Sequence, residues 1–257
     1  MNLDDVIDLD YEDFVKELKK LADDPKVQAI LNSEREKIAF AKGTVPANKL
    51  IPMQKELIIE KSIKHELAGK DMKAIHDILD GKPVLIIGEP IITLNSTYIV
   101  DGHHRYVAGY AFNPNARMVV YDMKLNIEPI EALKIIQIAI AATTKDIPFS
   151  KPEGTDLYTM HLNDLKNYIE DNIADKVADA LPYKTVYDAV MYILGNLILL
   201  KKHNKPISGA PTRLYMPQVS KAPESTEKLK KGKVNYKKPF TSFSQKFDDF
   251  LDGKFQI

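Results

Sequence analysis

Apolar side chains at helical spacing dominate the first part of the chain. Phe14, Leu18 and Leu21 follow one another three or four residues apart, and Pro25 separates them from a second stretch with similar spacing. This period predicts two consecutive helices, each with one apolar face. Acidic residues are frequent among these positions, so residues 1–43 are expected to form an acidic helical lead-in.

Between residues 44 and 125 the pattern changes to short apolar runs separated by turn residues. The runs predict strands within 45–51, 84–94, 97–100 and 116–123, and helices within 70–83 and 105–112. Val84–Ile87 is apolar on both faces, which indicates a central strand, and Asn95 with Ser96 marks a turn. Strands that alternate with a helix in this way predict a compact α/β unit.

The remaining residues divide into a helical domain and an arm. Residues 126–203 have a helical period again, with Pro129 in the first turn of one predicted helix. From Asn204 the period disappears, and the many prolines, serines and lysines predict an extended or disordered arm. The arm, 204–257, ends in aromatic residues at near-helical spacing, which predicts a short docking segment.

The charge of the chain is balanced as a whole but not along its length. Of the 257 residues, 36 are Lys or Arg and 36 are Asp or Glu. Residues 201–240 contain eleven basic residues and two glutamates, with Tyr215, Tyr236 and Phe240 between them. Such a segment can bind nucleic acid through phosphate contacts. The alternatives are a solvated tail and a segment that contacts the acidic body of a neighbouring subunit.

Several classes of site and location are excluded or disfavoured. The chain has no cysteine, which excludes disulfides, thiolate metal sites and cysteine nucleophiles. Its most apolar run is about ten residues long and too short to span a bilayer. The acidic first residues lack the basic and apolar pattern of a signal peptide. These features predict a cytoplasmic protein without a membrane partner.

The sequence IVDGHHRYVAGY, residues 99–110, contains the densest group of candidate functional side chains. A predicted strand ends at Val100, Asp101-Gly102 forms a turn, and a helix begins a residue or two later. The N–H groups at a helix start, together with the helix dipole, bind anions. Gly102 lets the backbone approach a ligand, and Arg105 in the first helical turn can bind two phosphate oxygens.

A simpler interpretation of these residues is structural. Asp101 would then cap the helix, and His103 and His104 would be solvent-facing polar residues. Adjacent histidines point in different directions, and the chain has no pair of histidines four residues apart here. A zinc site on this helix is therefore disfavoured.

The surroundings of this motif resemble the ParB/sulfiredoxin fold. The resemblance covers residues 45–123, from VPANKLIPMQ through GKPVLIIGEPIITLNSTYIVDGHHRYVAGYAFNP to the closing strand. In that superfamily the strand, turn and helix hold nucleotide phosphates, and the Asp-Gly-His-His-Arg form resembles free-serine kinases and ParB-like nuclease proteins of phages. The resemblance implies an α+β fold: a small mixed-sheet core flanked by N-terminal helices and a C-terminal helical region, with a basic extended arm.

The resemblance and the chemistry of the side chains together imply a nucleotide with Mg²⁺ as cofactor, the nucleotide being ATP, ADP or CTP. The phosphates would be held by Gly102, His103, His104 and Arg105. The metal would be held by Asp101 or Glu89, since Mg²⁺ on phosphates needs few protein ligands.

Five residues are candidates for catalytic roles. Asp101, His103 and His104 belong to the turn and can transfer protons near neutral pH. Gln54 and Glu56 lie in an early loop that is expected to face the terminal phosphate or the acceptor.

The chain departs from each branch that it resembles. Without a cysteine it cannot carry out sulfiredoxin chemistry. Free-serine kinases have a glutamate two residues after a loop proline, where this chain has Gln54 after Pro52, so a kinase would need Glu56 or Asp101 as its base. ParB proteins have a proline-glutamine element, which IPMQ resembles, and a helix-turn-helix DNA reader that is not evident after Glu128.

Three functions follow as alternatives. The leading one is a nucleotide-binding ParB-like protein that acts on or with DNA as a nuclease or NTP hydrolase, with the basic arm 204–240 contacting the DNA. The second is a small-molecule kinase of the free-serine type. The third is a non-catalytic phage structural or assembly protein that retains the fold, located in the host cytoplasm. Each is compatible with a homo-oligomer.

Overall fold

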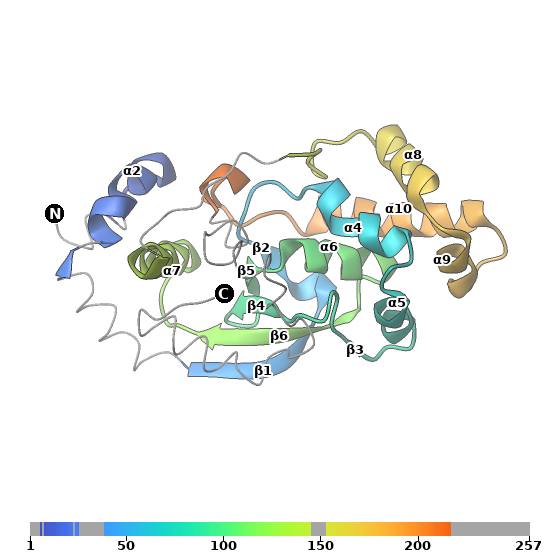
Figure 1. Ribbon diagram of the computed structural model, residues 1–257, viewed down its shortest axis with the longest axis horizontal. Helices are drawn as coiled ribbons and strands as arrows, with labels where there is room; N and C mark the ends of the chain where they lie inside the picture. Colours follow the sequence, from blue (N-terminus) through green and yellow to red (C-terminus); the bar gives the residue numbers. More distant parts are fainter. Residues whose placement is uncertain (1–5, 7, 23, 26–38, 145–152, 217–257) are drawn as a thin grey trace, which may run out of the picture. The chain divides into compact units, whose positions relative to one another are not determined.

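The computed structural model describes residues 6, 8–22, 24, 25, 39–144 and 153–216 (Figure 1). The helices are α2 (Tyr11–Ala22), α4 (Ile59–Leu67), α5 (Met72–Leu79), α6 (His103–Phe112), α7 (Pro129–Thr144), α8 (Leu162–Asn172), α9 (Asp175–Ala180) and α10 (Val186–His203), with short 3-10 helices η1 (Ala47–Lys49) and η2 (Arg213–Tyr215). The strands are β1 (Ala39–Pro46), β2 (Ile51–Pro52), β3 (Pro83–Val84), β4 (Ile91–Leu94), β5 (Tyr98–Asp101) and β6 (Arg117–Lys124). Most of the second helix predicted in the lead-in lies outside the described residues, but its predicted end is wrong, because residues 39–43 belong to strand β1. The predicted docking segment lies outside the described residues.

Contacts between residues group the chain into two compact units. The first unit contains residues 1–40, 124–151 and 211–257, and the second contains 41–123 and 152–210. Neither unit is one continuous segment. Of the helices predicted to form one domain, α7 belongs to the first unit, whereas α8, α9 and α10 belong to the second.

The described strands form one mixed six-stranded sheet, in the order β1-β6-β4-β5-β2 with β3 also paired to β6. β2 runs parallel to β5, β4 runs antiparallel to β5, and β3 and β4 run parallel to β6. Asn95 and Ser96, both with a φ of 54°, form the turn between β4 and β5, as predicted. Asp122 holds this turn by accepting hydrogen bonds from Thr93 Oγ1 at 2.8 Å and Ser96 Oγ at 2.7 Å. The predicted α+β class is therefore confirmed.

The predicted central strand Val84–Ile87 is wrong after its first residue. β3 ends at Val84, and the chain turns through Ile87 and Gly88, whose φ angles are 58° and 73°. Gly88 adopts this left-handed conformation without steric cost. The N–H of Ile87 donates to Asp71 Oδ2 at 3.0 Å instead of to a strand, and the Ile87 side chain is 50% exposed. The turn leads directly into β4.

The predicted strand 45–51 is also interrupted. β1 ends at Pro46, which has no N–H to continue a ladder. The next N–H groups, of Ala47 and Asn48, donate to Ala116 O at 2.9 Å and Pro114 O at 2.7 Å. These bonds hold η1, after which β2 begins.

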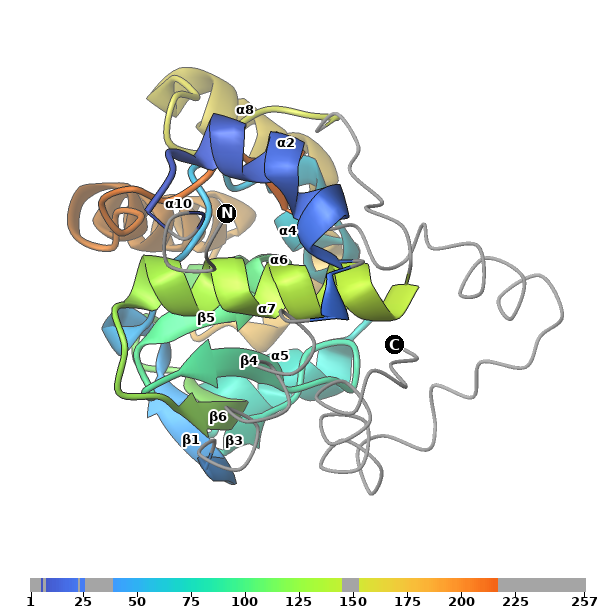
Figure 2. The same ribbon diagram turned by 90° about the vertical axis from the view of Figure 1, so that its left-hand side faces the viewer.

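Helix α6 is central to the second unit. α4, α6 and α10 lie on the same side of the sheet in both views (Figures 1 and 2), and α6 packs against both α4 and α10. Its side chains from Tyr106 to Phe112 are all buried. Tyr192 Oη donates to Phe112 O at 2.8 Å and Asn196 Nδ2 donates to Ala111 O at 2.9 Å. These two bonds fix one face of α10 against the end of α6.

The predicted arm begins too early. Asn204, its first predicted residue, is buried at the end of α10, and its Nδ2 donates to Asn48 O and Leu50 O at 3.0 Å each. The N–H of Ile207 donates to Pro52 O at 3.0 Å. Residues 204–216 are thus folded, because long-range hydrogen bonds replace the missing helical period. The remainder of the arm lies outside the described residues.

In the first unit α2 packs against α7. Phe14 and Leu18 of α2 are fully buried, as their spacing predicts. Tyr11 Oη donates to Gln137 Oε1 at 2.8 Å, and Lys134 Nζ lies over the rings of Tyr11 and Phe14 at 5.6 and 5.7 Å. Apolar burial and these polar contacts together attach the two helices.

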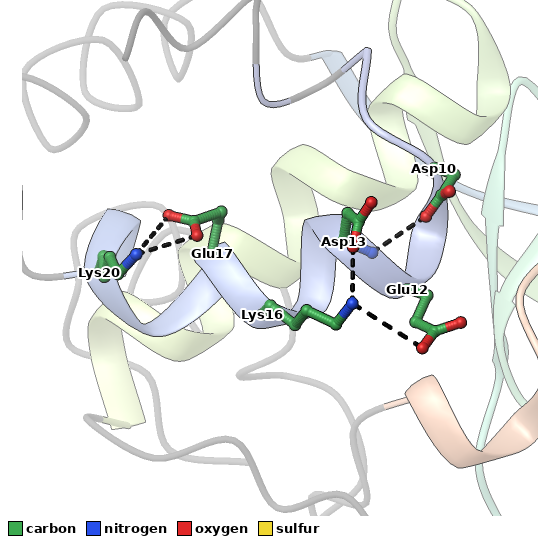
Figure 3. Close-up of polar contacts among 6 residues, drawn as sticks. All are labelled: Asp10, Glu12, Asp13, Lys16, Glu17 and Lys20. Carbon is green, nitrogen blue, oxygen red and sulfur yellow. Dashed lines mark hydrogen bonds and ion pairs between the residues drawn. The ribbon is translucent and has the colours of Figure 1, made fainter.

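The exposed side of α2 carries pairs of acidic and basic residues (Figure 3). Lys16 Nζ lies 2.7 Å from Asp13 Oδ1, and Lys20 Nζ lies 2.9 Å from Glu17 Oε1. Asp10 Oδ1 accepts the N–H of Asp13 at 3.0 Å. Exposed ion pairs of this kind contribute at most about 1 kcal/mol each. We therefore infer that the charged side chains on this face stabilise the start of the helix and keep the surface soluble, and that they do not form a functional site.

Glu66 on α4 is expected to make stability fall as pH rises. Its side chain is 2% exposed, and burial raises its pKa above the ordinary value despite the neighbouring His65. A carboxyl with a raised pKa contributes stability below its unfolded pKa, and this contribution is lost as pH rises through the folded pKa. Glu66→Gln should therefore raise the melting temperature near pH 8 and leave it unchanged near pH 4.

Glu60 on the same helix is the matched control. Although burial raises its pKa, hydrogen bonds from the N–H and hydroxyl of Thr155 outweigh burial, so the pKa lies below the ordinary value. A lowered carboxyl pKa stabilises the fold above the unfolded pKa. Glu60→Gln should thus lower the melting temperature near pH 8. If both variants shifted in the same direction, burial would not govern Glu66.

Candidate functional site

The strand, turn and helix predicted around residues 99–110 are confirmed. β5 ends at Asp101, Gly102 has a φ of 95°, and α6 begins at His103. The first helical hydrogen bond runs from Tyr106 N–H to Gly102 O at 2.9 Å. The N–H groups of residues 103–105 therefore precede the helical ladder, which is the part of a helix that attracts anions.

Arg105 is held across the turn by three oxygen atoms. Its guanidinium donates to Asp101 Oδ2 at 2.9 Å, to Glu89 Oε2 at 3.1 Å and to Pro90 O at 3.1 Å. Its side chain is 15% exposed, and no acceptor among the described residues lies within hydrogen-bond distance of its buried Nε. Arg105 is thus fixed beside the start of α6, and its buried Nε donor has no acceptor among the described residues.

The ion pair with Arg105 also sets the ionisation of Asp101. Desolvation raises the pKa of this carboxyl, but the Arg105 guanidinium, His103 and the N–H of Gly102 outweigh desolvation, so the pKa lies below its ordinary value. Asp101 is therefore a carboxylate at neutral pH. The structural interpretation in which Asp101 caps α6 is wrong, because Gly102 occupies the cap position and no side chain caps it.

His103 faces the protein interior and is only 5% exposed, so the expectation of a solvent-facing residue is wrong for it. The N–H of Met53 donates to His103 Nε2 at 3.2 Å. Nε2 therefore carries no proton, and a neutral His103 has its proton on Nδ1. Protonation of Nε2 would break this bond between the early loop and α6.

His104 points to α4 instead. Ser62 Oγ donates its proton to Ile58 O at 2.6 Å and lies 3.0 Å from His104 Nδ1. Since the hydroxyl proton of Ser62 is used, Nδ1 of His104 is the donor in that contact. The two histidines point to different elements, as predicted for adjacent positions.

The early loop lies at the same edge of the sheet as the turn. β2 pairs parallel with β5, with Pro52 opposite Ile99, so the residues after both strands meet at one edge. Gln54 is 2% exposed, and its Nε2 donates to Glu56 O at 2.7 Å. Gln54 therefore shapes the loop, while the half-buried Glu56 is the nearer of the two to solvent.

The structure thus brings all predicted site residues to one edge of the sheet: Asp101, Gly102, His103, His104 and Arg105 in the turn, Glu89 before β4, and Gln54 and Glu56 after β2. Within the described chain, no group of three or more His, Asp or Glu side chains could hold a metal ion. Both predicted metal ligands, Asp101 and Glu89, contact Arg105 instead.

Sequence reasoning missed two partners of the histidines, Met53 and Ser62. Ser62 belongs to the buried face of α4 together with Ile59 and Ile63. A polar residue at an apolar position of a helical period is a detectable signal, because a buried hydroxyl needs a partner. The Met53 contact uses only the backbone, so no side-chain pattern could indicate it.

Two findings concern the chain beyond this site. No helix in the part of the chain that the structure describes is long and apolar enough to cross a membrane. Comparison with protein-family models, with curated proteins and with solved structures finds no match.

Proposed function

We propose that this protein binds the phosphates of a Mg²⁺-nucleotide at the turn 101–105, in a domain of the ParB/sulfiredoxin type. The observation that carries the proposal is the position of Arg105, which lies beside the start of α6 and contacts Asp101 and Glu89. A guanidinium beside the start of a helix is suited to phosphate. Gly102, His103 and His104 provide the backbone that would approach it.

The two carboxylates explain why the nucleotide would need Mg²⁺. Asp101 and Glu89 carry two negative charges against the single positive charge of Arg105, so they would repel a phosphate that has no bound cation. Their side chains are 65% and 43% exposed, which leaves oxygens accessible to a cation. Mg²⁺ prefers carboxylate and phosphate oxygens. Mg²⁺ would therefore bind the two carboxylates, and Arg105 would donate its hydrogen bonds to the phosphates.

The proposed process is action on or with DNA, as a nuclease or an NTP hydrolase. Its support is the cluster of eleven basic residues within 201–240, seven of which follow residue 216 and can neutralise a phosphate backbone. Asn204 is part of the folded second unit, so the DNA contacts are assigned to the segment after residue 216.

A small-molecule kinase is the second candidate. It is favoured by the hydrogen bond from Met53 N–H to His103 Nε2, which attaches the early loop to the turn 101–105. Glu56 is the carboxylate of that loop, and it would take the proton of an acceptor hydroxyl, because the amide of Gln54 cannot. Phosphorylation of free serine by the purified protein would distinguish this candidate from the leading one.

A thermal-shift panel tests the proposal. ATP, ADP or CTP with Mg²⁺ should raise the melting temperature by about 5–10 °C at roughly 100 times the Kd. Addition of EDTA should abolish the shift, because the carboxylates then face the phosphates without a cation. A short DNA duplex in the same panel should stabilise the protein at low salt and not at high salt.

Two variants make the panel specific to the site. Arg105→Ala should lose the nucleotide shift, whereas Arg117→Ala, at an exposed arginine that begins β6, should keep it. A chain that ends at residue 216 should keep the nucleotide shift and lose the DNA shift. No shift with any nucleotide would leave the non-catalytic alternative, and an equal shift in Arg105→Ala would remove the site assignment.

A further inference from the structure

α10 carries an exposed apolar stripe on the side that does not face α6. Tyr187 is 57% exposed, Met191 39% and Leu199 43%. Tyr187, Met191 and Leu199 lie four or eight residues apart with Gly195 between the last two, so they share one helix face. Since Tyr192 and Asn196 fix α10 to α6, this stripe has a defined orientation on the second unit.

The central part of the stripe is symmetric about Gly195. Met191 and Leu199 lie four residues before and after Gly195, and Asp188 and Lys202 lie seven residues before and after it. All four flanking side chains are exposed. Residues seven apart return to nearly the same helix face. The pattern therefore places apolar side chains next to the centre, a negative charge near one end and a positive charge near the other.

Gly195 itself is unexplained by the fold of one chain. A Cβ at this position would meet no atom within 4 Å, and its backbone is not left-handed. A glycine in the middle of a helix costs about 0.5–1 kcal/mol relative to alanine. Its absent side chain leaves a flat point at the centre of the stripe, where another helix can approach closely.

We propose that a second copy of this chain packs on the stripe, with the two α10 helices antiparallel and a two-fold axis at Gly195. Met191 of each copy then contacts Leu199 of the other. Asp188 of each copy lies opposite Lys202 of the other. The interface is self-complementary, as a two-fold dimer requires, and the antiparallel helix dipoles are also favourable.

Charge complementarity selects a second copy as the occupant. A parallel arrangement would place Asp188 against Asp188 and Lys202 against Lys202. The antiparallel arrangement pairs both charges of both copies with opposite charges. The contact would run from Asp188 to Lys202, or about 20 Å of helix at 1.5 Å per residue.

The full chain should therefore be a dimer by sedimentation equilibrium. Leu199→Glu should raise the dimer Kd on the order of 100-fold, because two glutamates enter the apolar stripe. Leu214→Glu, at a leucine of η2 with 40% exposure, is the matched control and should leave the Kd unchanged. A monomeric full chain, or a dimer that Leu199→Glu leaves intact, would overturn the proposal.

Disulfide trapping tests the antiparallel geometry directly, since the chain has no native cysteine. Oxidation of a mixture of Met191→Cys and Leu199→Cys proteins should give predominantly the mixed disulfide dimer. Each variant oxidised alone should give little. Predominant homodimers of either variant would show a parallel contact and reject the two-fold axis at Gly195. Unchanged melting temperatures of both variants would confirm that the folds are intact.

Discussion

Replacing Gly102 with alanine is expected to lower the free energy of unfolding by about 2–6 kcal/mol. At a φ of 95° an L residue costs about 1–3 kcal/mol. The new Cβ would also lie 2.9 Å from an Nη of Arg105 and 3.2 Å from the Cα of Ile91, and overpacking adds about 1–3 kcal/mol. Urea unfolding measures this loss. Because the clash displaces Arg105, the variant should also lose its Mg²⁺-nucleotide shift.

Gly81 separates the two causes of this loss. Its φ is 67°, yet a Cβ there would meet no atom within 4 Å. Gly81→Ala should therefore show only the conformational cost, about 1–3 kcal/mol, and should keep the nucleotide shift. The difference between the two variants measures the crowding at Gly102. Equal losses in both would mean that the contacts of Gly102 with Arg105 and Ile91 have no energetic effect.

The strand, turn and helix of the candidate site could be predicted from sequence because each is determined locally. An apolar strand, a glycine at a left-handed position and a helical period follow one another within 99–110. The hairpin turn at Asn95 and Ser96 is similarly local, since these residue types tolerate a positive φ. Local conformational preferences therefore identify the edge of the sheet on which the site lies.

What could not be predicted depends on contacts between distant segments. The hydrogen-bond partner of the buried His103 is the backbone N–H of Met53, fifty residues earlier. Val84–Ile87 has the apolar residues of a strand, but the turn at Ile87 and the bond to Asp71 end it after Val84. Residues 204–216 have the composition of an arm, and hydrogen bonds to η1 and β2 fold them nevertheless.

These long-range contacts connect the fold to the site. The early loop begins at the end of β2, and β2 is held by Asn204 through Leu50 O and by Ile207 through Pro52 O. The same loop then supplies the N–H that fixes His103. Residues predicted to lie in an arm therefore support the turn 101–105 from a distant part of the chain.

Asn204→Leu is expected to lower the free energy of unfolding by roughly 3–6 kcal/mol, a large part of the stability of an ordinary domain. Asn204 Nδ2 donates to Asn48 O and Leu50 O, and its Oδ1 accepts the Tyr110 hydroxyl at 3.0 Å. Leucine would leave these three groups without partners, at about 1–3 kcal/mol for each of the two buried ones and less for the part-buried Asn48 O. Urea unfolding monitored by circular dichroism measures the change.

A control variant and a double mutant test this explanation. Among the described residues, Asn172 Nδ2 donates only to Tyr168 O of its own helix, at 2.8 Å, so Asn172→Leu should cost less than about 1 kcal/mol. Tyr110→Phe removes the hydroxyl that Asn204→Leu would leave without an acceptor. The double variant should therefore be more stable than the sum of the two single losses predicts. Strictly additive losses would mean that the Tyr110 hydroxyl and Asn204 do not interact, and the stability of η1 and β2 would need another source.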